Sequence, residues 1–335
     1  MPWKRRPFTS HSVARALNIA DLRAIARRRV PGFVFEYVES GAEDEVTLTG
    51  NCSELGRLRL IPQTLVNTSG RHLRSTILGR AANAPLVIAP TGLNGLLHAD
   101  GDVTLARAAA KLGIPYTLST VSTTRLEEVA SRAGGRLWMQ LYVVKDRAIG
   151  REIMQRAAAA GYEALVFTTD ANVFGNREWD QRSYRRPGKP TLRASLDALR
   201  HPRWLWEVMV RHGMPRFRNL EPFVPANLTP MGASTVIPRL FDATISWDDI
   251  GWIREHWQGK LLLKGVLNAA DAERAAALGA EAVLLGRATL YGLIAGGAAG
   301  VDRALTILTT EIDRVLGQLG CNDVTELGPH FVRRP

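Results

Sequence analysis

This chain has little cysteine: Cys52 and Cys321 are the only two among its 335 residues. They lie far apart, and neither belongs to a Cys-x-x-Cys pair or a Cys/His cluster. Disulfide frameworks and zinc sites both depend on such clusters, so the sequence argues against either. We therefore expect no metal, and a reducing cytoplasm is the expected location.

Long hydrophobic runs are also missing. No stretch approaches the roughly 20 apolar residues that a membrane-spanning helix needs. Residues 1–16 are basic and contain no acidic side chain, but they lack the apolar core of a secretory signal. A disordered basic tail is the favoured interpretation of this segment, and a transit peptide is the alternative.

Acidic residues are outnumbered by basic ones. The chain has 32 Asp and Glu against 43 Lys and Arg, which gives a formal net charge of +11. Such an excess of positive charge can attract nucleic acid, an anionic membrane or an acidic substrate. The arginines are scattered and no nucleic-acid recognition motif is present, so we expect no nucleic-acid partner. An arginine-rich proteome would explain the same excess.

What the sequence does have, from residue 85 onward, is an alternation of short apolar runs and alanine-rich helical stretches. The runs are PLVIAP, IPYTLST, RLWMQLY, ALVFTTD, KLLLKGV and EAVLLGR, at 85–90, 114–120, 136–142, 164–170, 260–266 and 281–287. Continuous apolar runs are typical of strands buried on both faces of a parallel sheet, so the pattern predicts an α/β fold. Each run ends in polar or glycine residues, and such strand ends build the active site of an α/β barrel.

Two further regions frame this alternation. Residues 17–30 show helical spacing that Pro31 and Gly32 end, and residues 33–45 predict a second helix. Residues 185–245 form a long insertion after the fourth run, rich in Pro, Arg and Trp, in which we expect no clear strand. Within it, residues 201–217 interleave tryptophans with arginines. A lid helix on the barrel mouth is the favoured interpretation, and a membrane-surface helix is the alternative.

Some residues at the strand ends suggest chemistry on their own. Lys264 ends an apolar strand and must meet an anion or solvent, the alternative being a plain rim lysine. Arg177 carries a planar guanidinium suited to a carboxylate. Gly92 lets a flat ring approach the backbone, unless it only serves a βα turn. Gly286 and Arg287 open the last helix, where a phosphate binds readily.

Seven segments carry a resemblance to a known family. They occur in family order and are FEYVESGAEDE (35–45), IAPTGLNGLLHADGD (88–102), TLST (117–120), QLYVVKDR (140–147), TTDANVFGNRE (168–178), LLKGV (262–266) and LLGRATLYGL (284–293). Each is weak alone, but together they are specific. The chain resembles the FMN-dependent α-hydroxy acid oxidase and dehydrogenase family, which includes glycolate oxidase, L-lactate dehydrogenase and mandelate dehydrogenase. The resemblance implies a TIM-type barrel over 17–320, with 1–16 as a basic tail and 321–335 as a C-terminal tail.

The resemblance also implies roles for individual residues. FMN is the implied cofactor, and its ring and ribityl chain would be bound by Pro90, Thr91, Gly92, Ser119, Gln140 and Thr168. Lys264 would face the ring edge that becomes negative on reduction, and Gly286 with Arg287 would contact the phosphate. Tyr37, Tyr142 and Arg177 would bind the substrate, although Tyr37 could instead be a core residue.

One family segment is absent. After LLKGV the family has a strand ending in Ser-Asn-His-Gly-Gly-Arg, whose histidine is the general base, and then a strand ending in Asp-Gly-Gly. None of the seven histidines here is followed by Gly-Gly-Arg. Segment 279–287 reads as the end of one βα unit joined directly to a later one. The barrel is therefore predicted to lack two βα units, on the order of 60 residues. His98 matches a family position and is interpreted as structural.

The family-level expectation is oxidation of a 2-hydroxy acid of the lactate, glycolate or mandelate class to a 2-keto acid. Gly92 and Val121 suggest a roomy pocket that favours larger, mandelate-type acids. The alternative is a flavin-binding remnant with impaired or absent catalysis, because the histidine segment is missing. The electron acceptor is open between oxygen, a quinone and a cytochrome. We also expect a homo-oligomer, with peripheral membrane contact through 201–217 as a further possibility.

Overall fold

The centre of the molecule is a parallel sheet of six short strands. The computed structural model describes residues 8–170, 173, 175–178, 182–186, 189–223, 240–266, 271 and 283–333. Within them the sheet order is β10-β7-β6-β5-β4-β11. The strands are β4 (Leu86–Ile88), β5 (Tyr116–Leu118), β6 (Leu137–Leu141), β7 (Ala164–Thr168), β10 (Lys260–Lys264) and β11 (Val283–Leu285). All six lie inside the apolar runs from which strands were predicted.

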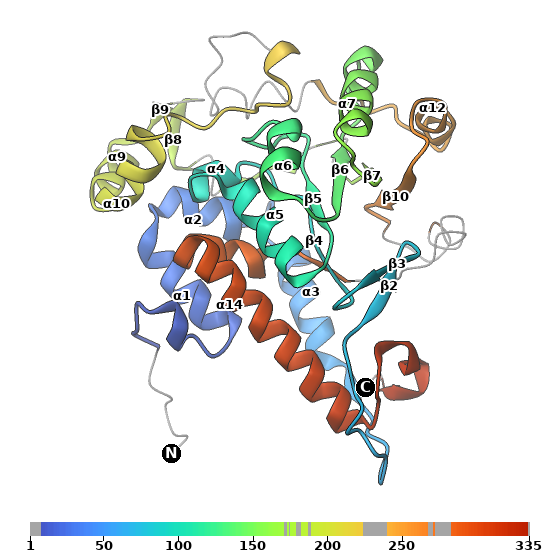
Figure 1. Ribbon diagram of the computed structural model, residues 1–335. Coiled ribbons are helices and arrows are strands. Elements are labelled where there is room, and N and C mark those ends of the chain that lie inside the picture. Colours follow the sequence, from blue (N-terminus) through green and yellow to red (C-terminus); the bar gives the residue numbers. More distant parts are fainter. Residues whose placement is uncertain are drawn as a thin grey trace.

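Helices cover the outer face of this sheet (Figure 1). After β4, β5 and β6 come α5 (Gly101–Leu112), α6 (Leu126–Ala133) and α7 (Arg147–Ala159), while α12 (Asp249–His256) precedes β10. Strands β4, β5, β6 and β7 are buried at every position. The continuous apolar runs thus reflect strands that have no solvent-facing side, and the polar residues that follow each strand gather at one edge of the sheet.

The strand order is that of a TIM barrel with a gap. Strand β11, near the end of the chain, pairs in parallel with β4, the first strand of the sheet, through Val283 and Leu86. In a closed barrel the last strand meets the first in this way. At the other edge β10 pairs with β7, and among the described residues no strand joins β10 to β11. The predicted α/β fold with an incomplete TIM-type barrel is confirmed, whereas residues 279–282 of the predicted junction lie outside the described part.

The N-terminal helices pack against the last helix. They are α1 (Ile19–Arg29), α2 (Gly32–Glu39) and α3 (Val46–Arg57), and the last helix is α14 (Arg287–Leu319). Figure 1 shows α1 and α2 beside α14 at one side of the sheet. Leu22 and Ile25 on α1 are fully buried there. Gly296 and Gly297 leave helical geometry and kink α14.

The insertion after β7 lies at the periphery, at the yellow elements in Figure 1. It contains β8 (Tyr184–Arg186) and β9 (Lys189–Pro190), then α9 (Leu192–Leu199), α10 (Pro202–Trp204), the π-helical η2 (Leu205–Val210) and η3 (Glu221–Phe223). The expectation that this region has no strand was wrong in one respect, because β8 and β9 form a short antiparallel pair. Two strands of two to three residues are too brief to give a readable alternation.

The remaining short elements surround the sheet and the end of α14. They are η1 (Val13–Arg15), β1 (Arg59–Leu60), β2 (Ser75–Ile77), β3 (Arg80–Ala82), α4 (Asn94–Leu97), η5 (Val324–Glu326), η6 (Pro329–Phe331) and β12 (Val332–Arg333). Strand β12 pairs with β1, and Cys321 and Phe331 are buried against α14. Among the helices of the described part, none combines the length and apolar character that crossing a membrane requires.

Candidate functional site

Three predicted cofactor residues form a continuous row across neighbouring strand ends. Ser119 follows β5, Gln140 lies on β6 and Thr168 ends β7, and all three are buried. The Ser119 Oγ donates to Gln140 Oε1 at 3.1 Å, and Gln140 Nε2 donates to Thr168 Oγ1 at 3.0 Å. The structure therefore brings together residues that are up to 49 positions apart. Their mutual hydrogen bonds fix the Gln140 amide at the base of the site.

The loop after β4 comes close to the loop after β5 at Gly92. A Cβ added to Gly92 would lie 2.7 Å from Val121 Cγ2 and 3.3 Å from Tyr37 Oη. Only glycine avoids that contact without a shift of its neighbours. Thr91 Oγ1 donates to Asn94 Oδ1 at 3.0 Å, which orients the loop that begins at Pro90. Gly92 and Thr91, both predicted to contact the cofactor, therefore also have structural roles in this turn that the sequence did not reveal.

A buried carboxylate holds these two loops in place. Asp102 at the start of α5 is fully buried. It accepts hydrogen bonds from Asn94 Nδ2 at 2.8 Å, Tyr116 Oη at 3.0 Å and Ser122 Oγ at 2.8 Å. Thr123 adds a hydroxyl donor at 3.0 Å. A buried charge is tolerated only with such compensation. Sequence reasoning missed Asp102, although the signal was present as an acidic residue in HADGD, inside a matched segment.

Arg177 and Tyr37 meet although 140 positions separate them. Arg177 Nη2 donates to the Tyr37 carbonyl oxygen at 2.7 Å and to Ser40 Oγ at 3.2 Å. Its guanidinium carbon lies 5.3 Å from the centre of the Tyr37 ring. The Tyr37 ring is partly buried against the core, while its hydroxyl reaches the Gly92 loop.

Tyr142 lies just after β6 and is partly buried. Its ring stacks on Phe241 with centroids 4.6 Å apart, and its backbone N–H donates to Thr120 Oγ1 at 3.1 Å. Burial, and after it the negative charge of Asp170, raises the pKa of Tyr142 to about 12. The phenol is therefore neutral at physiological pH and able to donate a hydrogen bond.

Lys264 ends β10 as predicted, but it has a partner that the sequence did not disclose. Its Nζ lies 2.9 Å from both carboxylate oxygens of Asp170, which follows the neighbouring strand β7. Lys264 thus meets an anion, as its place at the end of an apolar strand requires, and that anion is a carboxylate of the chain itself.

Gly286 follows β11 and Arg287 is the first residue of α14, so the pair opens the last helix as predicted. A Cβ on Gly286 would meet nothing within 4 Å. Arg287 is exposed, and its Nε donates to the Val38 carbonyl oxygen at the end of α2, 2.8 Å away. Arg287 is thus oriented by the N-terminal helices, a contact that no local pattern could show.

All seven histidines lie within the described residues. The Nδ1 of His98 lies 2.7 Å from the Ala99 carbonyl oxygen, and its ring faces the kink of α14, where a Cβ on Gly297 would be 2.6 Å from His98 Nε2. This position suits the structural interpretation of His98. The rings of His201 and His256 contact backbone oxygens one helical turn before them.

Comparison with known proteins identifies the family. The model of the FMN-dependent dehydrogenase family matches residues 26–277 and 274–334. The chain therefore belongs to the FMN-dependent dehydrogenase family, as the sequence predicted, and FMN is the cofactor of that family.

Its relatives include dehydrogenases of two hydroxy acids. The (S)-mandelate dehydrogenase of Pseudomonas putida is 38% identical over 371 positions, covering 94% of this chain and 93% of that protein. An L-lactate dehydrogenase of Xanthomonas campestris pv. campestris is 35% identical, covering 94% and 96%. A crystal structure of the monotopic membrane protein (S)-mandelate dehydrogenase superposes with a TM-score of 0.89 at 37% identity, covering 96% of this chain and 100% of that one.

The same comparisons locate the missing segment. The family model matches this chain in two parts that overlap at residues 274–277, a few residues before the predicted junction at 279–287. About 315 residues of this chain, 94% of 335, take part in an alignment of 371 positions, so about 56 positions of the mandelate dehydrogenase have no counterpart here. That is the length expected for two βα units, and it agrees with the gap between β10 and β11.

Proposed function

We propose that this chain binds FMN at the carboxyl ends of β4 to β10 and retains the substrate side of a 2-hydroxy acid dehydrogenase. The observation that carries the proposal is the buried row of Ser119, Gln140 and Thr168, with Lys264 on the next strand. These side chains offer donors and acceptors along one edge of the sheet, which is what a flat, polar heterocycle requires. Bound FMN would supply the acceptor for two electrons.

The fit to FMN is good for the ring and poorer for the phosphate. A side chain at Gly92 would collide with Val121 and lie close to Tyr37, so glycine lets this loop pack against both, and its backbone would face the ring. Pro90 and Thr91 would line the same side. At the phosphate end, Gly286 and Arg287 would contribute the first turn of α14, which favours anions.

The substrate would lie between the ring and the N-terminal helices. Arg177 would bind its carboxylate, because a guanidinium can make two parallel hydrogen bonds to that group. Tyr37 and the neutral phenol of Tyr142 would orient the carboxylate or the hydroxyl. The relatives' substrates, mandelate and lactate, suggest the acid class. The small side chains at positions 92 and 121, Gly92 and Val121, favour the aromatic one.

The missing histidine segment limits the rate of this chain. Removal of a general base typically lowers the rate by about 10²–10⁴-fold. We therefore propose that flavin binding outlasts efficient turnover. The test is an absorption spectrum of the purified chain with FMN, before and after anaerobic addition of (S)-mandelate or L-lactate. Flavin that binds and bleaches slowly supports the proposal. Rapid bleaching would show that a base is supplied from elsewhere, and a chain that binds no FMN would refute the site.

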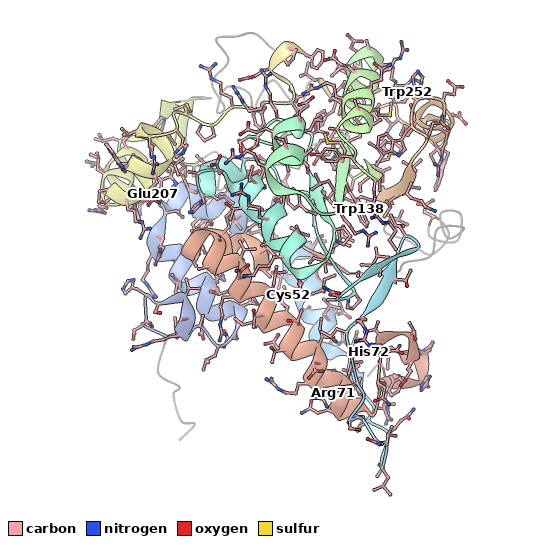
Figure 2. All side chains as sticks on the ribbon, in the orientation of Figure 1. Cys52, Arg71, His72, Trp138, Glu207 and Trp252 are labelled. Carbon is pink, nitrogen blue, oxygen red and sulfur yellow. The ribbon has the colours of Figure 1, made fainter. Side chains whose placement is uncertain are left out.

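We also propose that α9 to η2 contacts a membrane surface. Trp204 is buried and its Nε1 donates to the Leu96 carbonyl oxygen at 2.8 Å, whereas Trp206 and Val210 are 62% and 63% exposed. Figure 2 shows Glu207 among the yellow helices of this segment, at the periphery of the molecule. Leu192, Leu196 and Leu199 on α9 are also exposed. An apolar surface flanked by arginines suits an anionic bilayer. Co-sedimentation with phosphatidylglycerol vesicles tests this, and protein that remains in the supernatant at low salt would refute it.

A further inference from the structure

The ion pair between Lys264 and Asp170 joins two neighbouring strands at the edge where the flavin is proposed to bind. Lys264 Nζ lies 2.9 Å from both Asp170 oxygens. The two side chains are 32% and 34% exposed, so the pair is partly shielded from solvent. Asp170 comes two positions after the end of β7 and Lys264 is the last residue of β10, and these strands pair in parallel.

The backbone around the pair holds it in place. Thr169 donates to the Lys264 carbonyl oxygen through both its N–H, at 2.9 Å, and its hydroxyl, at 3.0 Å. Gly265 has a φ of +103°, and a Cβ there would lie 2.7 Å from Asp170 Cβ. The chain thus packs directly against Asp170. Surface ion pairs are often weak because two flexible side chains must be ordered, and here the backbone has already restricted one of them.

The charge of Asp170 also reaches other parts of the site. It contributes to the raised pKa of Tyr142, after burial. A lysine at this edge would attract an anion most strongly if its charge were not compensated. Because the Asp170 carboxylate compensates the ammonium of Lys264, the net charge of the pair is close to zero. Any anionic group that binds Lys264 must therefore compete with the Asp170 carboxylate.

We propose that Asp170 is a positioning residue for Lys264: it holds the ammonium across β7 and β10 and weakens the affinity of this edge for anions. Binding of an anionic group at Lys264 requires the pair to open. This inference rests on the proposed FMN site and adds the residue that regulates its charge. Because both partners of the ion pair belong to this chain, the pair can be tested without the cofactor.

The first experiment measures the reactivity of Lys264 in the chain without FMN. Limiting acetic anhydride labels lysines at rates that mass spectrometry can follow, and the exposed Lys260 serves as the internal reference. The variant Asp170→Asn keeps the shape of the side chain and removes its charge. We expect Lys264 to be acetylated about threefold to fivefold faster than in the parent chain, as release of a surface ion pair implies. The exposed carboxylate of Asp44 provides the matched control, Asp44→Asn, which should leave the rate unchanged.

The second experiment measures anion affinity with FMN bound. Sulfite would add reversibly to flavin N5: its sulfur lone pair forms the S–N bond, the displaced ring electrons place a negative charge at the N1–C2 carbonyl side, and a nearby cation stabilises that charge. Titration of the flavin absorbance should show sulfite binding about threefold to tenfold tighter in Asp170→Asn than in Asp44→Asn. The gain should vanish in a Lys264→Met background, because the effect acts through the lysine.

Each outcome decides the inference. Equal acetylation of Lys264 in the two asparagine variants would overturn it, as would a sulfite gain that persists without Lys264. If no variant binds FMN, the proposed cofactor site fails, while the acetylation rates still establish or refute the ion pair. If FMN binds and the sulfite affinity does not respond to Asp170, the cofactor site stands and the regulatory role falls.

Discussion

The hydroxyl of Tyr37 donates a hydrogen bond to the Gly92 carbonyl oxygen, with the two oxygens 3.2 Å apart. This contact joins the N-terminal helix α2 to the loop after the first strand of the sheet. It also closes the space around Gly92, since a side chain there would lie 3.3 Å from the same hydroxyl. The proposed flavin ring and the proposed substrate tyrosine are therefore positioned by one small turn.

The first prediction concerns that turn. We expect Gly92→Ala to lower the free energy of unfolding by about 1–3 kcal/mol, because its Cβ would overlap Val121 and force a shift. FMN affinity should fall as well, because the loop moves toward the ring. Urea denaturation and fluorescence quenching of FMN measure the two effects. Gly50→Ala on the exposed side of α3, where a Cβ meets nothing within 4 Å, is the control and should be neutral or stabilising.

The second prediction concerns the buried carboxylate. Asp102→Asn replaces an acceptor of several hydrogen bonds with an amide that brings its own donors into a site full of hydroxyl groups. We expect a loss of about 2–4 kcal/mol in the free energy of unfolding. Asp302→Asn removes a surface partner of Lys111 and should cost less than about 1 kcal/mol. Equal losses in urea denaturation would contradict the role assigned to Asp102.

The third prediction is a pH dependence. Burial, followed by Asp170, raises the pKa of Tyr142 from 10.0 to about 12. Between these values the unfolded chain loses the phenol proton while the folded chain retains it. Stability must therefore be fully present below pH 10 and decline as pH rises toward 12, with this tyrosine contributing on the order of 2 kcal/mol. The free energy of unfolding of Tyr142→Phe should decline less steeply over this pH window. Equal slopes of that free energy against pH for the two proteins would contradict the prediction.

The fourth prediction concerns the membrane contact. Trp206 and Val210 on η2 present their side chains to solvent. We expect the double variant Trp206→Ser, Val210→Ser to bind vesicles about tenfold or more weakly. The reason is that two large apolar groups no longer enter the bilayer interface. Folding should be unaffected, because neither residue is buried. Leu55→Ser, which alters a residue 72% exposed on α3, is the control. Retained vesicle binding in the double variant would place the contact elsewhere.

The sequence predicted much of the sheet because its signals are local. Each strand is an apolar run ended by polar residues, and Ser119, Gln140 and Thr168 lie at the strand ends where that pattern placed them. The long-range partners of other site residues were not predictable. The Asp170–Lys264 pair depends on β7 and β10 being neighbours in register, and the Arg287–Val38 contact depends on how α14 packs on α2. Such contacts follow from strand order and packing, which a single pattern does not encode.

The pairing of β11 with β4 has a consequence for the time course of folding. Strands β4, β5 and β6 each pair with the next strand along the chain, so the contacts of β4 to β7 can form stepwise, whereas β10 joins β7 only after the long insertion. Strand β11 must instead find a partner on the far side of the whole sheet, and closing so large a loop costs entropy before any contact is gained. The last strand and the helix that follows it should therefore dock in the slowest step. Until then, the phosphate end of the proposed site does not exist, and FMN would accelerate completion of the fold only after the ring side is already formed.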